Sequence, residues 1–152
     1  MKYSLILLSA LLVVACGGLS KEQQATAYND AALKYDAAGE AAYADYETAY
    51  DIATTDGEGL QALTDLYSSY SGATFMYVED LEKIAWTPEF SDDAQSMITC
   101  MQELYLLQID VLSASDNQEA LDISDVADAK EESCLSINET FRSILGLDPV
   151  TE

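Results

Sequence analysis

The chain has 152 residues, room for one domain or at most two small ones, and 49% of them are apolar, with 6 Lys plus Arg against 28 Asp plus Glu. The sequence contains no histidine, which excludes Ser-His-Asp and Cys-His catalysis, His-ligated zinc and haem, and Glu-x-x-His di-iron sites. The net charge of −22 argues against nucleic acid as a partner, because phosphates are bound by Lys and Arg.

Residues 1–16 have the features of a targeting signal rather than of a fold element. Lys2 is followed by a mostly apolar run that is too short to span a bilayer as a helix. The run ends in the sequence Val13–Cys16, which resembles the lipobox of bacterial lipoproteins. The resemblance implies cleavage after Ala15 and acylation of Cys16. An ordinary secretory signal that happens to end at a cysteine is the alternative.

The same resemblance implies a location in the cell envelope, with the lipid bilayer as a partner through acylated Cys16. Residues 1–15 are then a cleaved signal peptide, 16–19 are the lipidated cysteine and a short tether, and 20–152 are a single acidic helical domain. In enterobacterial lipoproteins an Asp after the cysteine favours retention in the inner membrane. Gly17 therefore favours the outer membrane if the host is Gram-negative.

Helical periodicity begins directly after the tether. Ser20 and Gln23 have the spacing of a capping box, which predicts a helix over residues 21–53. Small and apolar residues recur on one face of this helix in steps of three and four: Tyr28, Ala32, Tyr35, Gly39, Ala42, Tyr46, Ala49 and Ala53. The run Asp56–Gly59 is predicted to end it.

Three further helices are predicted in the rest of the chain. The second spans residues 60–84 and stops before Pro88, and the third begins with Ser91 as its N-cap and runs to about residue 112. A polar connection over 113–124 precedes a fourth helix from about Asp125 to Gly146. Short connections between long helices predict an all-α fold, an antiparallel up-down four-helix bundle. An irregular helical fold with the first helix projecting is the alternative.

Cys100 and Cys134 are the thiols that remain once Cys16 is acylated, and export places them where disulfides persist. Both are equally far from position 117, in the third connection, so an antiparallel hairpin brings them to the same height. This predicts a disulfide, worth about 3–4 kcal/mol in the chain-entropy model. Two separate buried thiols or a redox pair are the alternatives, although no nearby cation favours the latter.

Ten tyrosines and the excess of acids are the other unusual features. Tyr28, Tyr35 and Tyr46 share the small-residue face and are expected in the core, whereas the positions of Tyr43 and Tyr50 stay open. A set of acids recurs every three residues, which indicates either a weak divalent-cation surface or, as we prefer, a solvated acidic face: Glu119, Asp122, Asp125 and Asp128. No metal site and no cofactor are predicted.

We predict a non-catalytic adaptor, assembly or binding module of the cell envelope rather than an enzyme. A bundle that binds a small ligand or a divalent cation is the alternative. An adaptor predicts an exposed apolar or tyrosine patch, and a ligand carrier predicts a pocket with convergent polar groups. An enzyme predicts a cleft with a carboxylate of strongly perturbed pKa.

The short tether also predicts an orientation. The first helix starts at the bilayer surface, so the connection that holds Trp86 and Phe90 is expected beside the membrane, together with Leu147 and Val150. The opposite end carries acids without Lys or Arg, and we expect it to be a candidate surface for a basic envelope protein: Asp56, Glu58, Asp116, Glu119 and Asp122. A solvated tip, with the partner on the helix flanks, is the alternative.

Overall fold

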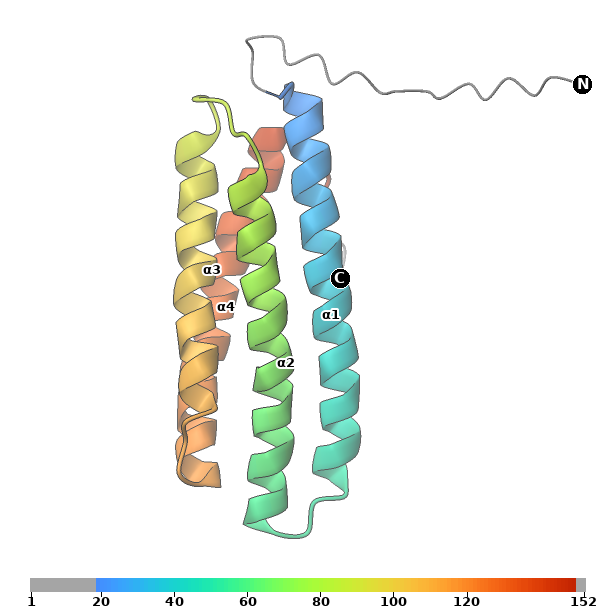
Figure 1. Cartoon of the computed structure of the whole chain (residues 1–152), viewed down its shortest axis with the longest axis vertical. Coiled ribbons are helices and arrows are strands. Elements are labelled where there is room, and N and C mark those ends of the chain that lie inside the picture. The colour runs from blue at the N-terminus through green and yellow to red at the C-terminus, as the bar shows by residue number, and fades with distance from the viewer. Residues whose placement is uncertain (1–18, 150–152) are drawn as a thin grey trace, which may run out of the picture.

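The computed structural model describes residues 19–149, and these form four helices and no strand. Helices α1 (Lys21–Asp51), α2 (Asp56–Lys83), α3 (Ser91–Val111) and α4 (Asn117–Leu145) run up and down in turn (Figure 1). The predicted all-α, up-down four-helix bundle is confirmed. The predicted signal peptide, Cys16 and Val150 lie outside the described residues. No described helix has the length and hydropathy to cross a membrane.

The start of α1 and the end of α4 follow their sequence signals. The Ser20 backbone N–H donates to Gln23 Oε1 at 2.9 Å, and the Gln23 N–H donates to Ser20 Oγ at 3.3 Å, which completes the predicted capping box. Gly146 ends α4 with a φ of 79°, a left-handed conformation that glycine adopts without a steric penalty. Both helix ends are therefore encoded locally.

The prediction that residues 56–59 end the first helix is wrong. These residues form the first turn of α2, because Thr55 is its N-cap and Glu58 completes a capping box around it. Two glycines in this turn are compatible with the helix since the cap satisfies its first N–H groups. Gly59 is also buried, and a Cβ there would lie 3.5 Å from Asn117 Oδ1.

The predicted starts of the third and fourth helices need correction as well. Helix α4 begins at Asn117 rather than Asp125, because Asp116 caps it by accepting the Glu119 N–H at 2.9 Å. The expected polar connection is thus mostly helix. Ser91 is the first residue of α3 and not its cap; Phe90 occupies the cap position without a side-chain bond.

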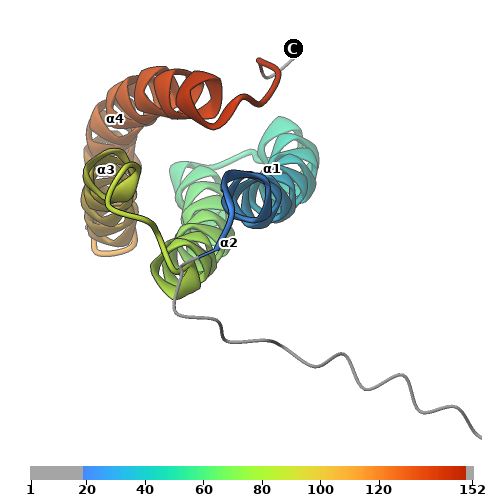
Figure 2. The same ribbon diagram turned by 90° about the horizontal axis from the view of Figure 1, so that it is seen from above.

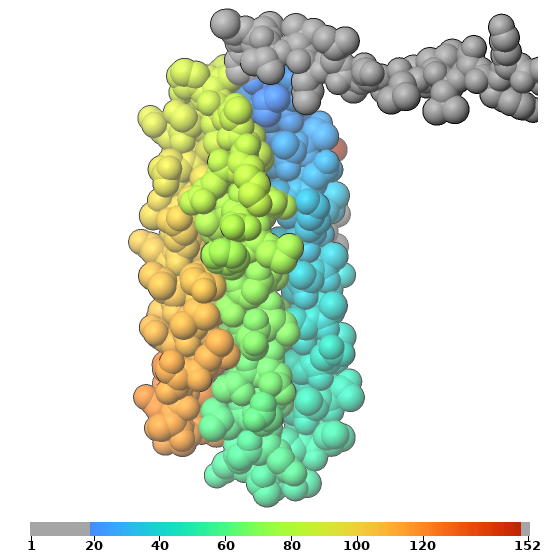
Figure 3. All heavy atoms as spheres, viewed as in Figure 1, coloured from blue at the N-terminus to red at the C-terminus, as the bar shows by residue number. Residues whose placement is uncertain are grey.

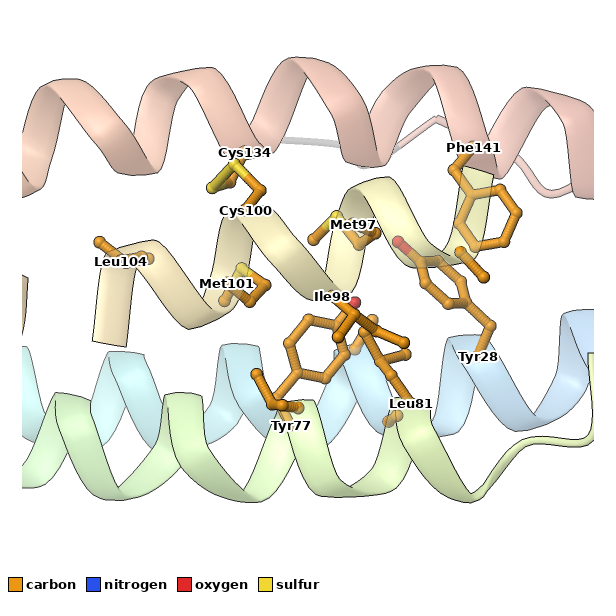
Figure 4. Close-up of a cluster of buried hydrophobic side chains, with 14 of the residues drawn as sticks. Tyr28, Tyr77, Leu81, Met97, Ile98, Cys100, Met101, Leu104, Cys134 and Phe141 are labelled. Carbon is orange, nitrogen blue, oxygen red and sulfur yellow. A yellow bond between two sulfur atoms is a disulfide. The ribbon is translucent and has the colours of Figure 1, made fainter. Parts of the chain in front are cut away.

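Aromatic core side chains cluster at the end of the bundle where α1 begins and α4 ends, which we call the N-terminal end. Tyr28 lies beside Phe141 in this cluster, with the two ring centroids 5.0 Å apart (Figure 4). The ring centroid of Trp86 lies 6.3 Å from that of Tyr28. Leu81 and Phe90 complete this buried cluster. Aromatic rings bury large areas and pack edge to face, so this cluster is expected to contribute much of the stability.

The four helices form two hairpins that meet along α2 and α3. Figure 2 shows that α1 and α4 approach each other at the N-terminal end and separate toward the opposite end. This opposite end, which we call the turn end, holds the connections 52–55 and 112–116 (Figure 1). The separation of α1 from α4 determines which side chains of the bundle reach solvent.

Candidate interaction surfaces

The two cysteines form the predicted disulfide. Their sulfurs are 2.09 Å apart and their Cα atoms 5.7 Å apart, and the bridge joins facing sides of α3 and α4 (Figure 4). Cys100 and Cys134 are both buried. The bridge closes a sequence separation of 34 residues and lies along the wall of a cleft described below.

The acidic residues of the turn end are largely helix caps. Glu58 Oε2 accepts the Thr54 N–H at 2.8 Å, the Thr54 hydroxyl at 2.9 Å and the Thr55 N–H at 3.1 Å. These hydrogen bonds, that of the Thr54 N–H first, hold the pKa of the exposed Glu58 carboxyl below its usual value. A carboxylate at this position also stabilises the positive end of the α2 dipole.

The connection before α4 repeats this arrangement. Glu119 Oε2 accepts both the Ser115 N–H and the Ser115 hydroxyl at 2.7 Å, and the hydrogen bond from the N–H is the main cause that lowers the Glu119 pKa. Asp116 caps α4, as described above. Three of the five acids expected to face a partner therefore have structural roles, and Asp56 and Asp122 lie outside these caps.

The acids spaced every three residues do not converge. Asp122 accepts a hydrogen bond from Gln118 at 2.7 Å, whereas Asp128 accepts one from the Tyr67 hydroxyl at 2.9 Å. Over residues 19–149, no three His, Cys, Asp or Glu side chains come together as a metal-binding group. The divalent-cation alternative therefore has no geometric support in that part of the chain.

Trp86 and Phe90 both lie at the N-terminal end, but their side chains differ in exposure. Phe90 is only 1% exposed and fills the core, with Lys21 Nζ 5.7 Å from its ring centroid. Trp86 is half-buried, and its indole N–H donates to the Leu81 carbonyl at 3.0 Å. Both rings contribute apolar area to the cluster around Tyr28, and burying that area stabilises the fold. That the connection holding these two residues lies beside a membrane stays a prediction.

An apolar groove lies between α2 and α3, which sit side by side on the face seen in Figure 3. It has a volume of about 460 Å³. Phe75 and Leu106 line it and are 49% and 61% exposed, and the Phe75 ring lies 5.9 Å from that of Tyr105. The rim is polar, with Gln102 of α3 donating to Glu82 of α2 at 3.1 Å. Large exposed apolar side chains with a polar rim are typical of docking surfaces.

A smaller cleft opens between α1 and α4 and holds about 30 Å³ of free space. We call it the tyrosine cleft; all four helices line it, with Tyr35 and Asp36 from α1, Tyr77 from α2, Met97 and Met101 from α3, and Glu131 and Cys134 from α4. The Tyr35 hydroxyl donates to Glu131 Oε1 at 3.3 Å. Burial raises the pKa of Glu131, and the charges of Asp128 and Asp36 add to that effect.

Between the tyrosine cleft and the turn end, where α4 diverges from α1, further tyrosines of α1 and α2 lie close to one another. Tyr43 and Tyr50 are 49% and 38% exposed, which resolves their open position. Their rings flank that of Tyr46 at 6.0 and 5.2 Å, and Tyr46 is half-buried rather than a full core residue. Tyr70 lies nearby on α2, and burial raises its pKa to about 12.

Sequence reasoning missed two buried polar residues that join the helices. The Gln24 side chain donates to the Leu19 carbonyl at 2.8 Å and accepts the Thr87 N–H at 2.9 Å, which ties α1 to the connection after α2. Asn138 Oδ1 accepts the Tyr28 hydroxyl at 2.5 Å. Their helical spacing from Tyr28 and Cys134 places both on core faces, and that spacing was the available signal.

No family model, curated protein or solved structure matches this chain. The fold and the disulfide define a small all-α bundle, and its function is inferred from its own residues.

Proposed function

We propose that this chain is a lipid-anchored lipoprotein of the cell envelope that acts as a non-catalytic binding module. The anchor rests on the sequence Val13–Cys16, and Gly17 favours the outer membrane in a Gram-negative host. The binding role rests on one observation, the exposed apolar groove between α2 and α3. An exposed apolar patch is the feature that distinguishes an adaptor from the other classes considered.

The chemistry of the groove supports a partner segment with apolar anchors and basic flanks. Phe75, Tyr105 and Leu106 offer apolar area, and burying such side chains against a partner stabilises a complex. Glu79 and Glu82 lie on the rim, and the net charge of −22 attracts a basic protein. Lys83 neutralises part of the rim, with its Nζ 3.4 Å from Glu79 Oε2.

A catalytic role has weaker support. Glu131 has a raised pKa and lies in a cleft, as an enzyme carboxylate would. Its hydrogen-bond partner is the phenol of Tyr35, however, and the cleft lining supplies no serine or free thiol as a nucleophile. The non-catalytic proposal is therefore the simpler one.

The groove is tested by two matched substitutions to glutamate. Leu106→Glu places a charge in the groove, and Leu33→Glu places one on α1 at a residue of similar exposure, 58% against 61%. Each variant is expressed with Cys16 intact and captured from detergent-solubilised envelope, with partners read by mass spectrometry. We expect one stoichiometric partner with the wild type and Leu33→Glu, and at least tenfold less with Leu106→Glu. Equal capture by both variants would contradict docking in the groove.

The anchor is tested independently. Cys16→Ser is expected to abolish labelling by a fatty-acid probe and to leave an uncleaved or soluble species. Unchanged labelling would remove the basis for the proposed localisation.

The acidic residues of the turn end are tested by combining Asp56→Asn with Asp122→Asn, because this double substitution leaves the caps made by Glu58 and Glu119 in place. If the turn end binds a basic partner, the double substitution reduces capture of that partner and the dependence of capture on salt. If neither changes, the partner docks elsewhere.

A further inference from the structure

The tyrosine cleft holds a half-buried carboxylate without a cationic partner. The ion pairs of residues 19–149 involve other carboxylates, and Lys130, the residue next to Glu131, pairs with Glu103 instead. Burial raises the pKa of Asp36, and the charge of the nearby Arg142 offsets only part of that rise, while the Arg142 Nε donates to the Asp148 carbonyl at 2.9 Å. A carboxylate removed from water is costly unless a cation pairs with it.

Aromatic rings form the wall beside this carboxylate. Tyr35 and Tyr77 stack with their ring centroids 5.1 Å apart and their planes 19° apart, and both line the cleft. The faces of tyrosine rings attract cations, most strongly where water is excluded. Met97 and Met101 add polarizable apolar surface, which suits an alkyl chain.

We propose that the tyrosine cleft binds a primary ammonium group carried on an unbranched alkyl chain. Glu131 is its main acceptor, Asp36 supplies a second negative charge, and the rings of Tyr35 and Tyr77 contact the cation. This site is independent of the proposed docking groove, because it lies on the other side of the bundle and uses other residues.

The size of the cleft selects this class of cation. A free volume of about 30 Å³ exceeds the roughly 10–15 Å³ that one water molecule needs, and an ammonium group is similar in size to water. A quaternary ammonium is larger than this space. The three N–H donors of an ammonium also match carboxylate oxygens, whereas no group of three metal-ligating side chains is present among residues 19–149.

Two sources of the same chemistry fit, namely a free linear diamine or the lysine side chain of another protein. The probes are therefore 1,4-diaminobutane and Nα-acetyl-lysine methylamide, titrated separately into the whole protein in detergent at physiological salt. Calorimetry measures affinity, and carboxyl carbon NMR follows Glu131. Saturable binding of either probe that shifts the Glu131 signal supports the site, and the tighter probe identifies the source.

Glu131→Gln and Glu132→Gln are the matched variants, because both remove one negative charge from adjacent positions and only Glu131 lines the cleft. We expect Glu131→Gln to weaken binding at least tenfold and Glu132→Gln to change it less than twofold. Butyltrimethylammonium is expected not to compete. Equal loss in both variants, equal competition by the quaternary amine, or an unmoved Glu131 signal in the wild type would each overturn the proposal.

Discussion

The two halves of α1 carry the same pattern of small and apolar residues but are buried very differently. In the first half, which ends at Asp36, five residues are buried, whereas in the second half only Ala42 is; the five are Gln24, Ala25, Tyr28, Ala31 and Ala32. The cause is the path of α4, which packs near the start of α1 and then diverges from it (Figure 2). A helical repeat therefore identifies which face turns inward, and the neighbouring helix decides how much of that face is covered.

Matched tyrosine truncations test this comparison most directly. Tyr28→Ala removes a fully buried ring and leaves Asn138 without its hydrogen bond, so we expect a loss of about 3–5 kcal/mol in the free energy of unfolding. Tyr46→Ala removes a half-buried ring from the same face of α1 and is expected to cost about 1 kcal/mol or less. Urea unfolding measures both. Equal losses would show that α1 is buried uniformly along its length in solution.

The disulfide bears on the different burial of the two halves of α1, because it joins α4 to α3 and not to α1. Replacing Cys100 and Cys134 together with serine is expected to lower the free energy of unfolding by about 3–4 kcal/mol. Reduction of the wild-type protein is the control and is expected to give the same loss. If neither treatment changes the urea midpoint, the bridge does not constrain the unfolded chain as assumed.

Alkaline pH probes the buried tyrosines at the N-terminal end and in the cleft. Burial raises the pKa of Tyr28 to about 12 and that of Tyr35 and Tyr77 beyond the ordinary tyrosine range. Above about pH 10 the unfolded chain loses these protons first, so stability falls as pH rises, by about 2 kcal/mol at pH 12 from Tyr28 alone. The buried tyrosines are expected to ionise only as the helical circular dichroism is lost, so the last part of the rise in tyrosinate absorbance coincides with unfolding. Complete tyrosine ionisation with retained ellipticity would contradict the burial.

Helix caps at the turn end are expected to have smaller effects. Thr55→Ala removes the acceptor of the Glu58 N–H and is expected to cost about 1 kcal/mol. Thr55→Ser keeps the hydroxyl and serves as the control, with little expected change. A loss of the same size in both variants would assign the effect to the lost methyl group instead of the cap.

The sequence predicts the helical class, the up-down order and the disulfide because each depends on local spacing. Its errors at residues 56–59 and 117–124 come from judging glycine and acidic runs by composition, although Thr55 and Asp116 were available as caps. The tyrosine cleft could not be predicted from the sequence, since Tyr35 and Glu131 are far apart in the chain and meet only through the packing of all four helices. The docking groove likewise depends on which side of α3 faces α2.

The smallest expected effects are two pH dependences of opposite sign. Hydrogen bonds at the exposed cap lower the pKa of Glu58, so its stabilisation is present above about pH 4.5, the usual glutamate value, and disappears as pH falls through the lowered pKa. Burial raises the pKa of Glu131, so the neutral carboxyl favours the folded state below pH 4.5, and that advantage disappears as pH rises through the raised pKa.

Glutamine substitutions separate the two contributions. Relative to the wild type, Glu58→Gln is expected to lower the urea midpoint at pH 7 and to change it less at acidic pH. Glu131→Gln is expected to raise the midpoint at pH 7, because it removes an unpaired half-buried charge while the amide retains an acceptor for the Tyr35 hydroxyl. Glu58 belongs to the solvated turn end, whereas Glu131 lies in the cleft between α1 and α4. Shifts of the urea midpoint with the same sign in both variants would mean that these two carboxylates do not differ in burial.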